Sequence, residues 1–192
     1  MAIICVIPAR GGSQRIKKKN IKLFYGKPII AYSIENAQLS GLFSRIIVST
    51  DDHDIAAVAR HYGAEVHFRD AGYGQDHIGT QEVVKECLER INAMAYDTVC
   101  CLYATAPLLS VDDLIEGYTA LGMSADYSMS VGYPPLQDAG QFYWGSCRCF
   151  LLNIPLISTH TRLINISPER VCDINTHTDW RRALKMYEEL HK

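Results

Sequence analysis

Short apolar runs alternate with longer amphipathic stretches along the part of the chain that precedes Gly132. Five runs are rich in apolar or β-branched residues: 3–7, 45–49, 65–68, 98–103 and 127–131. The first, second and fourth are nearly continuous, which is typical of parallel strands buried on both faces. The stretches between the runs predict helices over 29–39, 52–62, 81–94 and 111–121. This order predicts an α/β fold with a doubly wound, mostly parallel sheet, which binds ligands outside the carboxyl ends of its strands.

The alternation loosens after Val131. Gly and Pro interrupt it over residues 132–135, an aromatic run over 140–145 predicts a short strand, and residues 176–190 predict a closing helix. A chain of 192 residues buries roughly 70% of its unfolded surface, which suits one sizeable core better than two. We therefore expect residues 1–192 to form a single domain.

The charge along the chain is uneven. The net charge of −2 indicates by itself neither a nucleic acid nor a membrane surface as a partner. Residues 1–34, however, hold seven Lys or Arg and no acidic residue, so they contribute +7 and the rest of the chain −9. A basic block on an acidic body predicts a local anion site.

Seven cysteines, an odd number, include Cys100 and Cys101 side by side in an apolar run. Together with an N-terminus that lacks the features of a secretory leader, they predict free thiols in a reducing compartment. No run approaches the length of a membrane span. We therefore expect a cytoplasmic protein without a membrane partner. Cys147 and Cys149 form a C-x-C pair without a second pair, which favours buried thiols over a zinc site.

The basic block is densest in residues 7–21, directly after the first predicted strand. Gly11 and Gly12 would let backbone amides approach a ligand, and Ser13 adds a hydroxyl donor. Positive charge comes from Arg10, Arg15, Lys17, Lys18, Lys19 and Lys22. The segment is neither a Walker A loop nor a G-x-G-x-x-G fingerprint. Its composition and its place at a strand end fit a polyphosphate site, and the alternative is a solvated basic loop.

This segment resembles the N-terminal signature of the CMP-sialic acid synthetase family, the cytidylyltransferases that activate nonulosonic acids, which reads approximately A-R-x-G-S-K-x-x-x-x-K-N. Further matching motifs lie at Ser49–Asp52, Phe68–Arg69, Asp76–Thr80, Leu102–Leu108 and Asp173–Trp180. The string Asp138–Gly145 resembles most closely the branch that acts on pseudaminic acid. Because the motifs span nearly the whole chain, the resemblance implies the nucleotide-diphospho-sugar transferase architecture of that family.

The resemblance also implies roles for individual residues. Arg10 and Lys19 would contact the phosphates and, with Asp173, form the catalytic set. Eight residues would hold CTP: Ala9, Arg10, Gly12, Ser13, Lys19, Asn20, Arg69 and Thr80. Three would contact the sugar: Tyr103, Gln141 and Tyr143. Each of three residues has a structural role as the alternative. Arg69 would be a surface charge, Tyr103 a core aromatic residue, and Thr80 a helix cap before Gln81.

The metal motif of the family, D-x-D, here reads Asp173-Ile174-Asn175. Alternating residues on a strand point to one face, so Asp173 and Asn175 would still present oxygen ligands together. Because Mg²⁺ takes much of its shell from water and phosphates, one carboxylate suffices, and we expect Mg²⁺ as the cofactor.

Two other positions depart from the family pattern. Gln14 stands where the family has Lys, so Arg15 or Lys17 would have to replace its charge. Between Val131 and Asp138 the family carries a longer insertion that contributes dimer contacts, whereas residues 132–137 alone intervene here.

The implied reaction transfers CMP from CTP to the anomeric hydroxyl of an acidic nine-carbon sugar, most closely pseudaminic acid, and releases pyrophosphate. Such a reaction would serve bacterial surface glycan synthesis and flagellin glycosylation. The resemblance also implies that this chain forms a homodimer. One alternative is the same reaction on sialic, legionaminic or 3-deoxy-octulosonic acid. Another is a non-catalytic nucleotide or nucleic-acid binder, which the acidic body of the chain disfavours because it would repel an extended polyanion.

Overall fold

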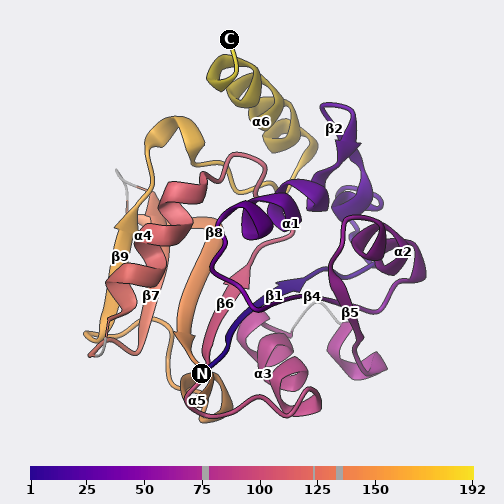
Figure 1. The fold of residues 1–192 in the computed structure, drawn as a ribbon. Coiled ribbons are helices and arrows are strands. Elements are labelled where there is room, and N and C mark those ends of the chain that lie inside the picture. Colours follow the sequence, from indigo (N-terminus) through magenta and orange to yellow (C-terminus); the bar gives the residue numbers. More distant parts are fainter. Residues whose placement is uncertain (75–77, 123, 133–135) are drawn as a thin grey trace.

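A seven-stranded, mostly parallel sheet organises the chain (Figure 1). The computed structural model describes residues 1–74, 78–122, 124–132 and 136–192. The strands of the sheet are β1 Ile3–Pro8, β4 Arg45–Thr50, β5 Glu65–Phe68, β6 Thr98–Leu102, β7 Tyr127–Gly132, β8 Gln137–Ser146 and β9 Thr161–Asn165. Their order is β5-β4-β1-β6-β8-β7-β9. β8 runs antiparallel to both β6 and β7, and the other pairs are parallel, which confirms the predicted α/β fold.

Helices cover both faces of this sheet (Figure 1). One face packs against α1 Ile29–Leu39, α2 His53–His61 and α4 Val111–Leu121, and the other against α3 Thr80–Arg90 and α5 Cys147–Leu151. Successive residues of β1 alternate between the two apolar layers, with Cys5 and Ile7 in one and Ile4 and Val6 in the other. This alternation follows from the two-residue period of a strand, and it explains why a strand buried on both faces is apolar throughout.

The strand order reverses between β1 and β6. From β1 the chain goes to β4 and β5 on one side and then returns to β6 on the other side. Loops that leave the carboxyl ends of β1 and β6 therefore diverge and leave a crevice between them. Because β8 is antiparallel to β6, its first residues, and not its last, lie at this same edge of the sheet.

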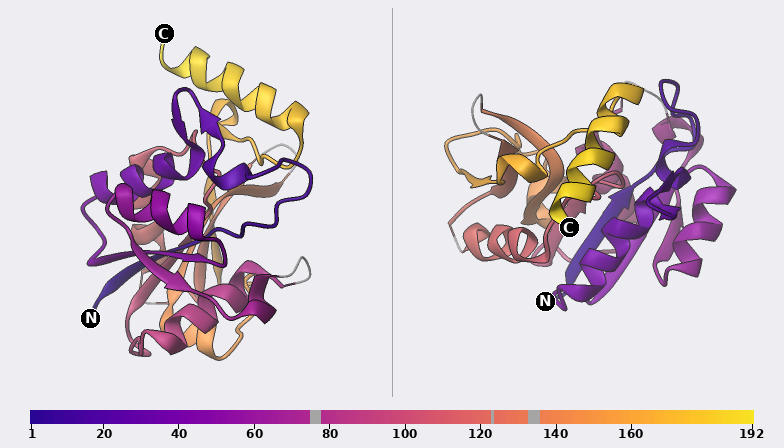
Figure 2. Two further views of the ribbon diagram at one scale, coloured as in Figure 1. Left: turned by 90° about the vertical axis from the view of Figure 1, so that its right-hand side faces the viewer. Right: turned by 90° about the horizontal axis from the view of Figure 1, so that it is seen from above.

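A small apolar core, here called the C-terminal core, lies beyond the edge of the sheet. Figure 2 shows α6 His177–Leu190 lying beside the hairpin formed by β2 Leu23–Phe24 and β3 Lys27–Pro28. The ring of Phe24 meets that of Trp180 edge-on at 5.6 Å between centroids. The buried members are Ile16, Phe24, Ile29, Tyr32, Leu108, Cys172, Ile174, Trp180 and Ala183. Ile16 belongs to the basic loop and Ile174 to the D-x-N motif, so this core ties the two loops together.

Several predicted helix boundaries agree with the structure to the residue. α1 and α4 occupy 29–39 and 111–121 as expected, and Asp52 caps α2 by accepting hydrogen bonds from two backbone amides. α3 ends at Arg90 and not at Met94, because Asn92 takes a left-handed conformation (φ 52°) that closes the helix.

The prediction was incomplete beyond Val131. β8 is longer than the expected strand over 140–145, and α5 and β9 were not predicted. Of the shortened segment 132–137, residues 133–135 lie outside the described residues, as do 75–77 in the Asp76–Thr80 motif and 123. The single-domain organisation stays a prediction.

All seven cysteines are free and buried, as expected. Among the described residues, no helix combines the length and the apolar character needed to cross a bilayer.

Candidate functional site

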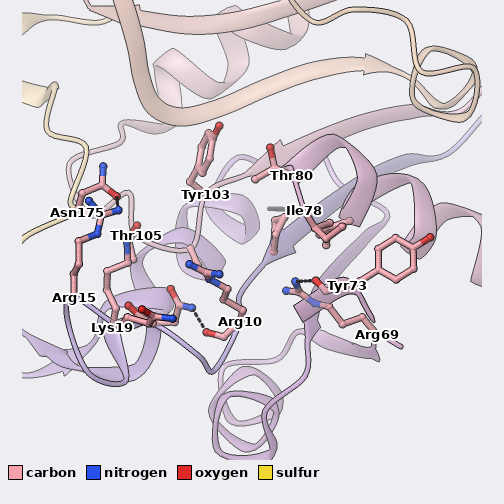
Figure 3. A pocket seen from close by; sticks show the side chains of 16 residues that line it. Arg10, Arg15, Lys19, Arg69, Tyr73, Ile78, Thr80, Tyr103, Thr105 and Asn175 are labelled. Carbon is pink, nitrogen blue, oxygen red and sulfur yellow. Dashed lines mark hydrogen bonds between the residues drawn. The ribbon is translucent and has the colours of Figure 1, made fainter. Parts of the chain in front are cut away.

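The carboxyl ends of β1 and β6 open onto a cavity of about 560 Å³ (Figure 3). Its walls come from the loop after β1, the residues after β5, the start of α3, the residues after β6 and the loop before α6. The lining residues are Pro8, Arg10, Ser13, Gln14, Arg15, Lys19, Asn20, Arg69, Tyr73, Ile78, Thr80, Val83, Tyr103, Ala104, Thr105 and Asn175. The cavity thus lies at the switch point of the sheet, where doubly wound folds bind ligands.

Contacts with the surrounding protein fix the shape of the basic loop. The buried Asn20 side chain donates from Nδ2 to the carbonyl of Arg10 at 2.9 Å, and the Gly11 amide donates to Oδ1 of Asp51 at 2.8 Å. A Cβ at Gly11 would lie 2.5 Å from Oδ2 of Asp52. The expectation that the Gly11 amide faces a ligand is therefore wrong, since Gly11 is required for close packing on the cap of α2. A Cβ at Gly12 would meet nothing within 4 Å, and the role of Gly12 stays a prediction.

Cationic side chains line the cavity, but only some of them come from the basic block, and only part of that block faces the cavity. Lys18 turns away and pairs through Nζ with Oδ2 of Asp54 at 2.6 Å, and Lys22 lies 5.4 Å from the ring centroid of Trp180. Arg69 comes from outside the block. The cationic side chains of the lining are Arg10, Arg15, Lys19 and Arg69. Counting charges predicted the sign of the site correctly but not the identity of every contributor.

Lys19 joins the basic loop to the loop before α6. Its Nζ donates to the carbonyl of Ile174 at 2.7 Å. Burial lowers the pKa of Lys19 below its ordinary value of 10.5, Arg15 and Arg10 add to the decrease, and Asp173 opposes it. A lysine held among cations in a partly buried position gains most from an anionic ligand, because such a ligand offsets both effects.

Arg69 is a buried cavity residue, so its interpretation as a surface charge is wrong. Its Nη2 donates to the carbonyl of Ser49 at 2.6 Å. Its Nη1 donates to the carbonyl of Tyr73 at 3.0 Å (Figure 3). Burial lowers the pKa of Arg69, with Arg10 acting in the same direction, while Asp51 and Glu86 raise it. Two backbone carbonyls thus hold the guanidinium rigidly against the cavity.

Asp173 and Asn175 lie on a loop and not on a strand as expected. Their side chains nevertheless meet, because Nδ2 of Asn175 donates to Oδ2 of Asp173. Oδ1 of Asn175 accepts a long hydrogen bond of 3.5 Å from Nη2 of Arg15. Between them, Ile174 is fully buried in the C-terminal core, so both polar side chains are turned outward. The pairing came from the anchored residue between them and not from strand geometry.

Thr80 is the first residue of α3, and the cap residue is Gly79, so the interpretation of Thr80 as the cap is wrong. Its Oγ1 accepts a hydrogen bond of 2.9 Å from the hydroxyl of Tyr143. Tyr143 is itself 1% exposed, and Gln141, 2% exposed, donates from Nε2 to the carbonyl of Arg170 at 2.7 Å. Both side chains lie behind the cavity wall, and their contact with a sugar stays a prediction.

Tyr103 combines both interpretations made for it. Its ring packs against the apolar layers on the two faces of the sheet, yet it lines the cavity, and its hydroxyl donates to Oδ2 of Asp138 at 3.3 Å. Ser13, Asn20 and Arg10 line the cavity, and their contact with the nucleotide stays a prediction. The methyl group of Ala9 is buried and its amide donates to the carbonyl of Ser49 at 2.9 Å.

Some lining residues received no role from the sequence. Ala104 and Thr105 come after Tyr103, just beyond the carboxyl end of β6, and lie in the Leu102–Leu108 motif. The rule that ligands bind at carboxyl strand ends was therefore a sufficient signal for them. Tyr73 and Ile78 lie between β5 and α3. Ile78 falls within the Asp76–Thr80 motif, whereas no sequence pattern distinguishes Tyr73.

A doubly wound sheet with a cation-lined cavity at its switch point defines an α/β protein of the nucleotide-binding class. The model of the cytidylyltransferase family matches residues 4–143. The chain is 34% identical to a pseudaminic acid cytidylyltransferase of Campylobacter jejuni over 229 aligned positions, covering 100% of this chain and 99% of the relative. This chain belongs to the cytidylyltransferase family.

The chain is also similar to a second relative and, in its fold alone, to a solved structure. A CMP-N,N'-diacetyllegionaminic acid synthase of Campylobacter jejuni is 43% identical over 109 residues, 55% of this chain and 46% of that relative. A solved CMP:2-keto-3-deoxy-manno-octonic acid synthetase complexed with CTP shares the fold, with a TM-score of 0.80, 15% identity and coverage of 99% and 100% of the two chains. Because the pseudaminic acid relative aligns over 229 positions and this chain has 192 residues, that relative carries residues that this chain lacks.

Proposed function

We propose that this chain transfers CMP from CTP to the anomeric hydroxyl of pseudaminic acid and releases pyrophosphate. The observation that carries the proposal is a cavity lined by four cations in a chain with full-length similarity to a pseudaminic acid cytidylyltransferase. In the reaction the anomeric oxygen bonds to the α-phosphorus while the bond from that phosphorus to the oxygen bridging it to the β-phosphate breaks. Pyrophosphate leaves with that oxygen, and the proton of the anomeric hydroxyl is released to solvent.

The lining of the cavity suits this chemistry. Phosphoryl-type transfer depends mainly on positioning the reactants and on neutralising charge at the phosphate oxygens. Arg10, Arg15 and Lys19 supply positive charge from the basic loop, and Arg10 and Lys19 are the proposed phosphate contacts. Ser13 and Asn20 would hold the nucleotide beside them, and Arg69 and Thr80 would do so from the opposite wall.

Magnesium is part of the same proposal. Asp173 offers a carboxylate and Asn175 an amide oxygen, and both are ligand types that Mg²⁺ accepts. The fit is partial, because Oδ1 of Asn175 accepts a hydrogen bond from Arg15. Asp173 would therefore hold the ion, and Asn175 would join after releasing Arg15. The bound ion would withdraw negative charge from the phosphate oxygens.

The metal ligands would have to be completed by the nucleotide. Within the described ranges, no cluster of three or more His, Cys, Asp or Glu side chains forms a metal cage. This agrees with the preference of Mg²⁺ for phosphate and water oxygens.

A homodimer and a role in bacterial surface glycan synthesis also belong to the proposal, since the resemblance to the family implies both. A cytoplasmic location belongs to it as well and is supported by the seven free cysteines. Light scattering coupled to size exclusion tests the first. A mass of two chains supports a dimer, and a mass of one chain contradicts it.

The decisive experiment measures pyrophosphate release from CTP with pseudaminic acid, with and without Mg²⁺. We expect release that requires both the sugar and the metal. If no acid sugar leads to pyrophosphate release, the proposal is overturned in favour of a non-catalytic nucleotide-binding protein.

A second substrate, legionaminic acid, is favoured by the higher local identity to a CMP-N,N'-diacetyllegionaminic acid synthase. Parallel assays with pseudaminic, legionaminic, sialic and 3-deoxy-octulosonic acid separate these candidates by the ratio of kcat/KM. We expect pseudaminic acid to give the highest value, because the relative that carries this name matches the chain over its full length.

A further inference from the structure

Asp138 is a carboxylate at the rim of the site that the proposed mechanism does not use. It is the second residue of β8, whose first residues lie at the ligand-binding edge of the sheet. The backbone of β8 is joined to the cavity wall here, since the amide of Tyr103 donates to the carbonyl of Gln141 at 2.8 Å. Asp138 therefore adjoins the part of the cavity that Tyr103 lines.

Two hydrogen bonds orient the carboxylate without using up its capacity. Oδ1 accepts from the amide of Gly140 at 2.8 Å, and Oδ2 accepts from the hydroxyl of Tyr103 at 3.3 Å. An ionised carboxylate offers about four acceptor positions, so it can accept further donors. The bond from Tyr103 is long, which leaves its hydroxyl able to turn toward a ligand.

The electrostatic surroundings of Asp138 differ from those of the cationic wall. The protein around Asp138 removes part of its hydration, which raises its pKa, and the carboxylate of Asp173 adds to the increase. The hydrogen bonds from Gly140 and Tyr103 oppose this increase. Asp138 is thus an acceptor without a cationic partner among these groups. Such a carboxylate attracts neutral N–H and O–H donors and repels anions.

An acid sugar likewise has two chemically different parts, one anionic and one that carries neutral hydrogen-bond donors. Its anomeric carbon carries both the carboxylate and the reacting hydroxyl, so these groups must lie beside the phosphates, where Arg10, Arg15 and Lys19 gather. Its other hydroxyls and its acylamino N–H groups project away from that end and need acceptors.

We propose that Asp138, oriented by Tyr103 and the Gly140 amide, accepts hydrogen bonds from the hydroxyl or acylamino groups of the acid sugar and so helps to hold the sugar in the cavity. This inference rests on the proposed function and adds to it a residue that determines specificity.

The test compares Asp138→Asn with the wild-type enzyme by steady-state pyrophosphate release, varying sugar and CTP separately. The amide oxygen of Asn can still accept from Gly140, whereas its NH₂ group replaces one acceptor with a donor. We expect the KM for the sugar to rise about tenfold or more, with the KM for CTP changed less than about twofold, because only sugar binding is affected. Tyr103→Phe should raise the sugar KM in the same direction but less.

Asp112→Asn, the same chemical change at an exposed position on α4, serves as the matched control and should leave both KM values unchanged. An unchanged sugar KM for Asp138→Asn, or an equal rise in both KM values, would overturn the inference. A variant that unfolds well below the wild-type temperature would instead assign Asp138 a structural role and also overturn it. If the wild-type enzyme itself turns over no acid sugar, the proposed function fails, and the inference fails with it.

Discussion

The two walls of the cavity are held in place in different ways. On the wall from the first half of the chain, Asn20 donates to the carbonyl of Arg10, two residues after β1, and Arg69 donates to that of Ser49 near the end of β4. Both strands lie inside the sheet and not at its edge. On the opposite wall, Asp173 and Asn175 lie on a loop that pairs with no described strand of the sheet, and Ile174 anchors it in the C-terminal core. The first wall inherits the rigidity of the sheet, whereas the second depends on α6.

This difference separates two ways to damage the site. Changes on the first wall should remove charge while leaving the geometry intact. Changes in the C-terminal core should displace the second wall although they touch no ligand-binding group.

Arg10→Ala should have the largest effect on activity. Removing one donor to a charged transition state typically costs about 10²–10³-fold in rate, and the sheet should keep its fold. Pyrophosphate release measures the loss, and circular dichroism checks the fold. Lys18→Ala is the matched control, because Lys18 belongs to the same loop but pairs with Asp54, and it should retain near-normal turnover. Near-normal turnover by Arg10→Ala would show that the first wall does not bind the phosphates.

Trp180→Ala tests the dependence of the second wall on α6. Trp180 is 5% exposed in the C-terminal core, and truncating such a side chain should lower the free energy of unfolding by about 3 kcal/mol. Denaturant unfolding measures this change, and the KM for CTP should rise in addition. Leu190→Ala at the exposed end of the same helix should change little. An unchanged unfolding midpoint for Trp180→Ala would show that the C-terminal core is not required to hold the loop.

Asp173→Asn should weaken magnesium activation with a smaller effect on folding. Loss of the carboxylate should raise the Mg²⁺ concentration for half-maximal activity about tenfold, because the amide brings no charge. A magnesium titration at saturating CTP measures the shift. Superimposable titrations for the variant and the wild-type protein would remove Asp173 from the metal site.

The pH dependence of CTP binding should show the smallest effect. The pKa of Lys19 is below its ordinary value of 10.5, so Lys19 loses its charge earlier than an exposed lysine as the pH rises. The charged form binds the triphosphate, and affinity for CTP should therefore fall on the alkaline side, within the range below 10.5. Lys19→Arg should remove this decline. A KM for CTP that is independent of pH up to 10.5 in the wild-type protein would contradict the assignment.

The first half of the fold could be predicted closely from the sequence because each element there has one clear period. α1 and α4 were predicted to the residue from their amphipathic spacing. The position of β8 could not be predicted, because an apolar aromatic run indicates a strand but neither its neighbours nor its direction. β9 escaped prediction because it is a short edge strand, buried at Ile164 but exposed at Arg162 and Leu163.

The site shows the same division. Motif positions predicted that Arg10, Lys19 and Arg69 would meet, although they are far apart in sequence, because strand ends converge at the switch point. The direction in which each side chain points could not be predicted from the sequence. Lys18 turns to Asp54 because that carboxylate lies within reach, which only the tertiary fold determines.

The reversed direction of β8 separates two properties along one short segment. Gln137 and Asp138, at its start, are exposed at the ligand edge, whereas Phe142 and Trp144, further along, are fully enclosed by the helices and the sheet. By the inference above, a mutant library limited to the first pair would explore substrate preference with little risk to folding. A library at the second pair would explore thermostability while leaving the choice of sugar unchanged.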